Sequence, residues 1–152
     1  MGGTLMVFEV SKAPKTKKEF TNWYYEQVDW KDEDDFDYDN PQNASANLQN
    51  WFYEMIITFP PMNGPLAPTV EQCDDYDLWD WTVDYSISRD IIYFGFPYSK
   101  ADKVYNLTRE LAIKHGVGFF NVEHEDGDII LPDGTYIHEK CWKYYKIKNF
   151  LG

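Results

Sequence analysis

The sequence predicts an α+β domain in which helices pack on an antiparallel sheet. Four short segments are rich in β-branched and aromatic residues, as strands are, at residues 5–10, 81–88, 91–96 and 117–123. Segments with helical spacing of apolar residues separate them. With 152 residues and a 43% hydrophobic fraction, the chain is long enough for one domain with its own core. We expect that core within residues 5–123, in a single domain spanning residues 1–152.

The first strand and the first helix follow directly from the N-terminal residues. Residues 5–10 are nearly all apolar, which favours a central strand. Thr16 and Glu19 form the T-x-x-E pattern of a capping box, in which each side chain accepts a main-chain N–H of the first turn. Apolar residues recur from Phe20 to Val28 at helical spacing, so we expect a helix ending near Asp29.

Residues 48–59 carry the strongest helical pattern in the chain. Ser45 is a suitable N-cap for this helix, and Pro60 and Pro61 end it because proline lacks an N–H and clashes with the preceding turn. The apolar face comprises Leu48, Trp51, Phe52, Met55, Ile56 and Phe59. Residues 60–68 contain four prolines and predict a stiff loop, in which Gly64 supplies a positive φ.

The second half predicts a hairpin, a helix and a fourth strand. Residues 81–88 alternate between apolar and polar, and residues 91–96 are almost wholly apolar. The S-x-x-D pattern beginning at Ser99 predicts a cap for the next helix, and Gly116 is the expected residue at its C-terminal end.

The resulting order, β-α-α-β-β-α-β, fits a ferredoxin-like split βαβ arrangement with its helices on one face of the sheet. An extra helix lies between the first two strands. Residues 124–152 predict an appendage, with a short strand near 128–131 and a turn at 132–134. Residues 140–150 predict either a final helix or an irregular basic tail.

The net charge is −12, and it is unevenly distributed. Residues 19–90 contain 17 acidic side chains against Lys31 and Arg89, a balance of −15. Such a field repels nucleic acids and anionic membranes and favours a cationic protein partner. A simpler interpretation is that the acidic surface keeps the protein soluble.

The sequence shows no secretory leader and no run of about 18 apolar residues, so we expect a cytoplasmic protein. The two cysteines, Cys73 and Cys141, are then expected as reduced thiols.

No motif predicts a metal, a cofactor or a reaction. His124, Asp126, His138 and Cys141 are possible ligands, but only one paired arm is present and zinc sites usually have two. Residues 32–39 lack the glycine and glutamate of an EF-hand loop. No phosphate loop, dinucleotide motif or nucleophile elbow occurs. We therefore expect no cofactor, no metal and no enzymatic activity.

Two acidic and aromatic segments flank the helix at 48–59. We expect both to be exposed loops, and we call residues 29–39 the first acidic segment and residues 71–80 the second. Aromatic rings surrounded by carboxylates suit a protein interface, because rings supply buried area and charges steer a basic partner. The alternative is that the rings turn inward and leave a solvated acidic surface. The candidate partner-binding residues are Asp29, Trp30, Asp32, Glu33, Asp34, Asp35, Phe36, Asp37, Tyr38, Asp74, Asp75, Tyr76, Asp77, Trp79 and Asp80.

Several segments resemble a family of small acidic bacterial proteins, mostly uncharacterised. They are MVFEV, WYYEQVDW, WFYEMIITFPPMNGP, DYSISRDIIYFGF, KHGVGFFNV and LPDG, and the similarity covers residues 5–134. The most distinctive are residues 59–65 and 84–93. Small acidic proteins of this kind are often immunity proteins of interbacterial toxins, and the resemblance supplies no catalytic residue.

We therefore predict a non-catalytic binding protein, an immunity protein that occludes a basic toxin through the two acidic segments. One alternative is a small-ligand-binding protein or enzyme with a pocket between the sheet and the loop at 60–68, lined by Tyr85, Tyr93 and a carboxylate of shifted pKa. Another is a homodimer formed through an open sheet edge, so the expected state is monomer or homodimer.

Overall fold

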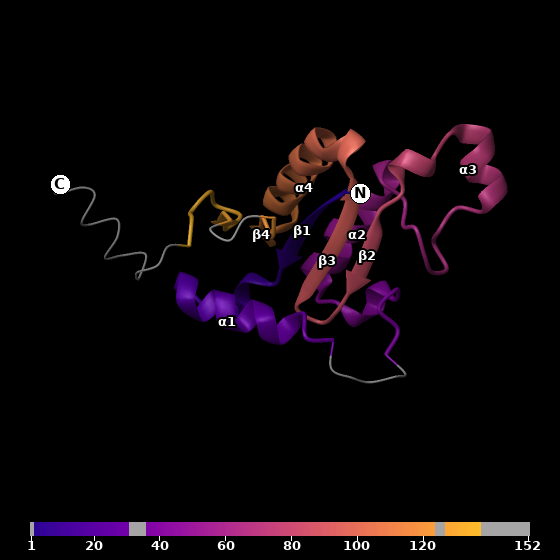
Figure 1. The fold of residues 1–152 in the computed structure, drawn as a ribbon. Helices are drawn as coiled ribbons and strands as arrows, with labels where there is room; N and C mark the ends of the chain where they lie inside the picture. Colours follow the sequence, from indigo (N-terminus) through magenta and orange to yellow (C-terminus); the bar gives the residue numbers. More distant parts are fainter. Residues whose placement is uncertain (1, 31–35, 124–126, 138–152) are drawn as a thin grey trace.

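The computed structural model describes residues 2–30, 36–123 and 127–137, and it has an α+β fold with a five-stranded antiparallel sheet (Figure 1). The strands are β1 (Gly2–Phe8), β2 (Asp84–Ile87), β3 (Ile91–Pro97), β4 (Gly118–Phe120) and β5 (Ile129–Ile130). The helices of this part are α1 (Lys17–Gln27), α2 (Ala46–Thr58), α3 (Val70–Tyr76) and α4 (Ala101–His115). Within it, no helix is long and apolar enough to cross a membrane.

The strand order is β2-β3-β1-β4-β5, and every neighbouring pair is antiparallel. The N-terminal strand is therefore central, as predicted, although it begins at Gly2 rather than at residue 5. Alternate residues of a strand face opposite sides of a sheet. Leu5 and Val7 consequently face one side, and Met6 and Phe8 face the other.

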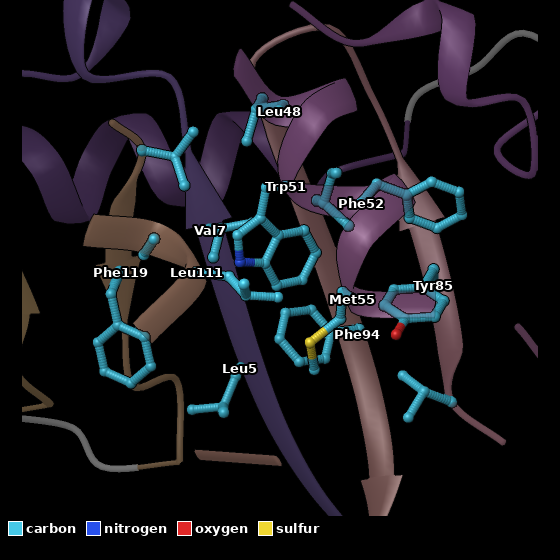
Figure 2. Packing of buried hydrophobic residues seen from close by; sticks show 14 of the residues in the cluster. Leu5, Val7, Leu48, Trp51, Phe52, Met55, Tyr85, Phe94, Leu111 and Phe119 are labelled. Atoms are coloured by element: carbon cyan, nitrogen blue, oxygen red, sulfur yellow. The ribbon is translucent and has the colours of Figure 1, made fainter. Parts of the chain in front are cut away.

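The larger core lies between the sheet and helices α2 and α4. Leu48, Trp51, Phe52 and Met55 of α2 are buried there, as their spacing predicted. Figure 2 shows Trp51 among side chains of the sheet and of α4, and its ring lies 5.4 Å from that of Phe94. We call this side the α2/α4 face.

Helix α1 covers the opposite side of the sheet, so the prediction that the helices lie on one face is wrong. The Phe20 ring packs on Phe8 and Phe120, at centroid distances of 4.9 and 5.2 Å. Both of these rings belong to strand residues that face away from α2 and α4. We call this side the α1 face.

Most of the predicted helix ends are confirmed. The hydroxyls of Thr16 and Ser45 accept N–H groups at the starts of α1 and α2, and Gly116 ends α4 in the left-handed region. The cap predicted at Ser99 is wrong, because Tyr98–Lys100 forms a 3₁₀ turn that leads directly into α4 without a side-chain cap.

The second acidic segment is not the loop that we predicted. Val70–Tyr76 forms α3, which opens with a capping box between Thr69 and Gln72, and Trp79–Trp81 forms a 3₁₀ turn. The order of the described elements is thus β-α-α-α-β-β-α-β-β. The predicted strand near 128–131 is present as β5, which extends the sheet beside β4. The alternatives for residues 140–150 lie outside the described residues.

Candidate binding surface on the open part of the sheet

The α1 face is only partly covered by its helix. Rings of α1 cover Met6, Phe8 and Phe120, towards one end of the sheet. The row that contains Phe120 and Met6 continues through Tyr93 of β3 to Ser86 of β2. Trp30 of the first acidic segment packs against Tyr93, with ring centroids 6.0 Å apart. The rest of the face is open.

An open groove of about 440 Å³ occupies the uncovered end of the sheet. Its floor includes Thr4, Gly95 and Asp84, which are aligned across β1, β3 and β2 by the strand register. Directly opposite residues share one face of a sheet, and Thr4 lies on the same side as Met6. The groove therefore belongs to the α1 face. We call it the sheet groove.

The walls of the sheet groove come from two loops. Met62, from the proline-rich loop, and Trp79 and Thr82, from the 3₁₀ turn after α3, line it together with Gly2, Gly3, Phe96 and Pro97. Main-chain hydrogen bonds fix the first loop to the sheet, from Met62 N–H to Val83 O and from Val83 N–H to Pro60 O. The Trp79 indole N–H donates to Asp74 Oδ1 at 2.8 Å, and the Thr82 hydroxyl donates to Trp79 O.

The Asn63–Gly64 turn connects the first acidic segment to the groove. Asn63 Nδ2 donates to Asp84 Oδ1 at 3.4 Å. A Cβ placed on Gly64 would lie 2.8 Å from Cβ of Asp39, so the turn packs tightly against that residue. Gly64 has a φ of 90°, as predicted, which a residue with a side chain rarely adopts. The turn therefore places Asp39 and Asp84 near one another.

Three carboxylates of this region act on each other. Burial raises the pKa of the Asp39 carboxyl above its ordinary value, and the negative charges of Asp37 and Asp84 raise it further. The field at this edge of the sheet is thus negative, and a cation near Asp39 would relieve the repulsion.

The predicted partner-binding residues that the structure describes fall into three groups. Trp30, Phe36 and Tyr38 pack on one another, with Tyr38 4.9 Å from Trp30 and 4.5 Å from Phe36, so these rings are partly turned inward. Tyr76 and Trp79 are exposed, at 72% and 52% of their surface. The carboxylates of Asp29, Asp37, Asp74, Asp75, Asp77 and Asp80 lie at the surface. Asp32, Glu33, Asp34 and Asp35 lie outside the described residues.

The sequence indicated only Trp79 among the residues that line the groove, and not Gly2, Gly3, Thr4, Met62, Thr82, Asp84, Gly95, Phe96 or Pro97. It placed the alternative pocket beside the loop at 60–68, and Met62 does line the groove. Of the residues proposed for that pocket, Tyr85 is wrong, because it is buried in the α2/α4 core and donates its hydroxyl to Phe59 O at 2.8 Å. Burial raises the pKa of that phenol well above its ordinary value. Tyr93 lies on the α1 face but does not line the groove. Gly95, inside an otherwise apolar strand, was the available indication of an open floor.

Metal binding finds no support in the described part of the chain, where no group of three or more His, Cys, Asp and Glu side chains could hold an ion. Of the ligand types named above, His124, Asp126, His138 and Cys141 lie outside the described residues. Cys73 is a buried thiol on α3. What the groove offers chemically is one carboxylate, two hydroxyls, an indole and a thioether.

No protein-family model, curated protein or solved structure matches the chain.

Proposed function

We propose that this chain is a non-catalytic protein-binding domain whose partner is a basic protein. The observation that carries the proposal is the proximity of Asp37, Asp39 and Asp84, the last of which lies on the floor of the groove. Burial raises the pKa of the Asp39 carboxyl, and the charges of Asp37 and Asp84 raise it further. Folding brings these like charges together at a cost to stability. A bound cationic surface would offset that cost.

The exposed rings beside these charges support the same function. Tyr76 and Trp79 project from the second acidic segment, and aromatic side chains supply much of the binding energy at protein interfaces. The surrounding carboxylates of Asp74, Asp75 and Asp80 would steer a basic partner and accelerate association.

The specific form that we propose is an immunity protein, which neutralises a basic toxin in the cytoplasm by covering its active site. Its support is the resemblance of residues 5–134 to small acidic bacterial proteins and the net charge of −12. The partner-binding residues would be those of the two acidic segments, including Trp79 at the groove, together with Asp84.

A small-ligand-binding protein or an enzyme is the second candidate, favoured by the groove itself. Its volume of about 440 Å³ falls within the range of roughly 300–1,000 Å³ typical of ligand pockets. The described lining residues, however, contain a single carboxyl group and no histidine, cysteine or lysine. Acid–base or nucleophilic chemistry needs a second positioned group, so binding is the better interpretation.

A homodimer through the β2 edge is less favoured. At that edge, the Val83 N–H donates to Pro60 O and the Val83 carbonyl accepts from the Met62 N–H. The Ile87 N–H donates to Tyr38 O. An edge occupied in this way is protected against pairing with a second chain.

We also propose that the fold is a ferredoxin-like split βαβ with additions. In its support, strands β4-β1-β3-β2 follow the order expected of that arrangement, and α2 and α4 lie on one face. Helices α1 and α3 and strand β5 would be the additions.

The test is to express the product of the adjacent gene and measure its affinity for this protein at several salt concentrations. We expect submicromolar binding that weakens steeply as salt rises, because the contacts are largely ionic. A triple variant, Asp37→Asn, Asp75→Asn and Asp80→Asn, should bind at least tenfold more weakly. The matched control, Glu26→Gln, Glu110→Gln and Asp128→Asn, removes the same charge elsewhere and should bind nearly as the wild type does. Micromolar or weaker binding without salt dependence would contradict the proposal.

A further inference from the structure

The sheet groove combines one anionic group with flat and flexible apolar surfaces. Asp84 lies on its floor, Trp79 contributes an indole, and Met62 and Pro97 contribute apolar walls. Within the described part of the chain, Asp84 accepts a single long hydrogen bond, of 3.4 Å, from Asn63, and a carboxylate can accept about four. The floor beside it has no side chain, because its neighbour across the strands is Gly95.

The position of Trp79 is fixed by a polar contact outside the groove. Its N–H donates to Asp74, and its carbonyl accepts from the Thr82 hydroxyl, whose residue is 5% exposed. The indole is therefore held in place before any partner arrives, and ordering it on binding costs little entropy. The same chain already places cations over a neighbouring indole, with Lys100 Nζ 4.2 Å and Lys103 Nζ 5.0 Å from the ring of Trp81.

We propose that the sheet groove receives one arginine side chain of the basic partner. Its guanidinium would pair with the Asp84 carboxylate and contact the Trp79 indole, while its aliphatic stem lies along Met62 and Pro97. This inference rests on the proposed function and identifies the contact at its centre.

Arginine suits these lining groups better than lysine. A guanidinium is planar and weakly hydrated, stacks on aromatic rings and pairs with a carboxylate through two parallel N–H groups. The ammonium of lysine is a compact and strongly hydrated charge. It stacks less well on a flat indole and does not pair with both carboxylate oxygens at once.

Gly95 allows the groove to be closed without disturbing the fold. A Cβ at this position would lie 3.7 Å from the nearest neighbouring atom, Gly3 O, which is ordinary van der Waals contact. Its φ is not in the left-handed region, and valine is favoured in strands. The substitution Gly95→Val should therefore fill the floor at unchanged or higher stability. Asp84→Asn removes the charge and keeps the shape.

The experiment is a low-salt NMR titration of the full chain with acetyl-Gly-Arg-Gly-amide, and with the lysine and citrulline peptides in its place. With the arginine peptide we expect shifts of the Thr4 and Gly95 amides and the Trp79 indole N–H. The lysine peptide should bind more weakly, and the neutral citrulline peptide should give none of these shifts. Asp84→Asn should weaken arginine binding about tenfold or more, as expected for the loss of a charged hydrogen bond. Gly95→Val should also weaken it, because its side chain occupies the floor of the groove. Glu110→Gln, which removes a charge on α4, should bind as the wild type does.

Two results would overturn this inference while leaving the proposed function intact. One is shifts confined to the acidic segments; the other is arginine binding that Gly95→Val and Asp84→Asn leave unchanged. Thermal unfolding of both variants, with midpoints at or above that of the wild type, shows that a loss of binding is not a loss of fold. Failure of the proposed function itself appears separately, as weak and salt-independent binding of the adjacent gene product.

Discussion

The two faces of the sheet differ in how completely they are covered. On the α2/α4 face, Leu5, Val7, Phe94 and Phe119 meet two long helices in a continuous buried cluster. On the α1 face, a shorter helix covers Met6, Phe8 and Phe120, the rings of Trp30 and Tyr38 cover the next part, and the groove is open.

In our proposal, this difference separates stability from recognition. The covered face holds most of the buried apolar surface, which is the main stabilising contribution to a fold. The open end of the α1 face holds carboxylates and exposed rings that contribute little to stability and remain available for contact. Substitutions on the α2/α4 face should therefore lower stability more than binding. Substitutions at the open end of the α1 face should lower binding more than stability.

Replacing Trp51 should have the largest effect on stability. Its side chain is fully buried, and its N–H donates to Thr108 O at 3.3 Å. Trp51→Ala should lower the free energy of unfolding by about 3–5 kcal/mol. Trp79→Ala, in the groove wall, should cost about 1 kcal/mol or less, because Trp79 is half exposed. Urea denaturation checks both, and equal losses would contradict the separation of the two faces.

Two glycines should distinguish the covered part of the α1 face from the open part. A Cβ on Gly118 would lie 2.2 Å from the ring of Phe8, whereas Gly95 has space. Gly118→Ala should therefore destabilise the fold by about 1–3 kcal/mol. Gly95→Ala should be neutral or stabilising. Thermal unfolding measures the difference, and a destabilised Gly95→Ala would mean that the groove floor is already filled.

Removing the hydroxyl of Tyr85 tests a polar contact inside the α2/α4 core. Tyr85→Phe leaves the Phe59 carbonyl without this donor and should cost about 1 kcal/mol. Tyr98→Phe is the control, because Tyr98 is 57% exposed, and it should change stability very little. Chemical denaturation of the two variants gives the comparison, and equal effects would argue against a buried hydrogen bond.

The carboxyl groups of Asp39 and Glu54 should respond to pH in opposite directions. Because the pKa of Asp39 is raised, its ionised carboxylate destabilises the folded protein. This destabilisation is lost as pH falls through the pKa of the folded state and the group becomes protonated. Asp39→Asn should therefore stabilise the protein at pH 7 by about 0.5 kcal/mol or less, with the gain lost in acid.

Hydrogen bonds from Lys114 and His115 lower the pKa of Glu54, on α2. The ionised Glu54 therefore stabilises the fold at pH values above its unfolded pKa, and this stabilisation is lost as pH falls through its folded pKa. Glu54→Gln should lower the unfolding midpoint at pH 7 and have little effect in acid. Midpoints measured from pH 3 to pH 8 test both variants. The same sign of change at pH 7 would contradict this contrast between the faces.

The sequence was most informative where local chemistry decides structure. Ser45 caps α2, Gly64 and Gly116 take positive φ, and residues 84–97 form the predicted hairpin. Helix α3 was missed because its acidic content indicated a loop, although Thr69 and Gln72 carried the pattern of a capping box. The side of the sheet that α1 covers was also mispredicted, since an apolar stripe does not specify which face it meets.

The groove could not be predicted in the same way, because it depends on register. Thr4, Gly95 and Asp84 are far apart in the sequence and become neighbours only when β1, β3 and β2 pair. Trp30 and Tyr38, expected as interface anchors, pack on each other, and the sequence did not indicate this contact. Whether an aromatic ring turns inward depends on contacts with residues distant in the sequence, and these contacts cannot be predicted from local composition.

The central claim is that the partner binds the open end of the α1 face. Hydrogen exchange of the complex with the adjacent gene product, compared with the free chain, tests it directly. We expect protection in residues 36–39, 62–64, 71–84 and 95–97, and unchanged exchange along the outer surface of α2 and α4, where Ile57 and Ile113 are exposed. Protection confined to α2 and α4 would contradict the account, because the partner would then bind the face that we assign to stability.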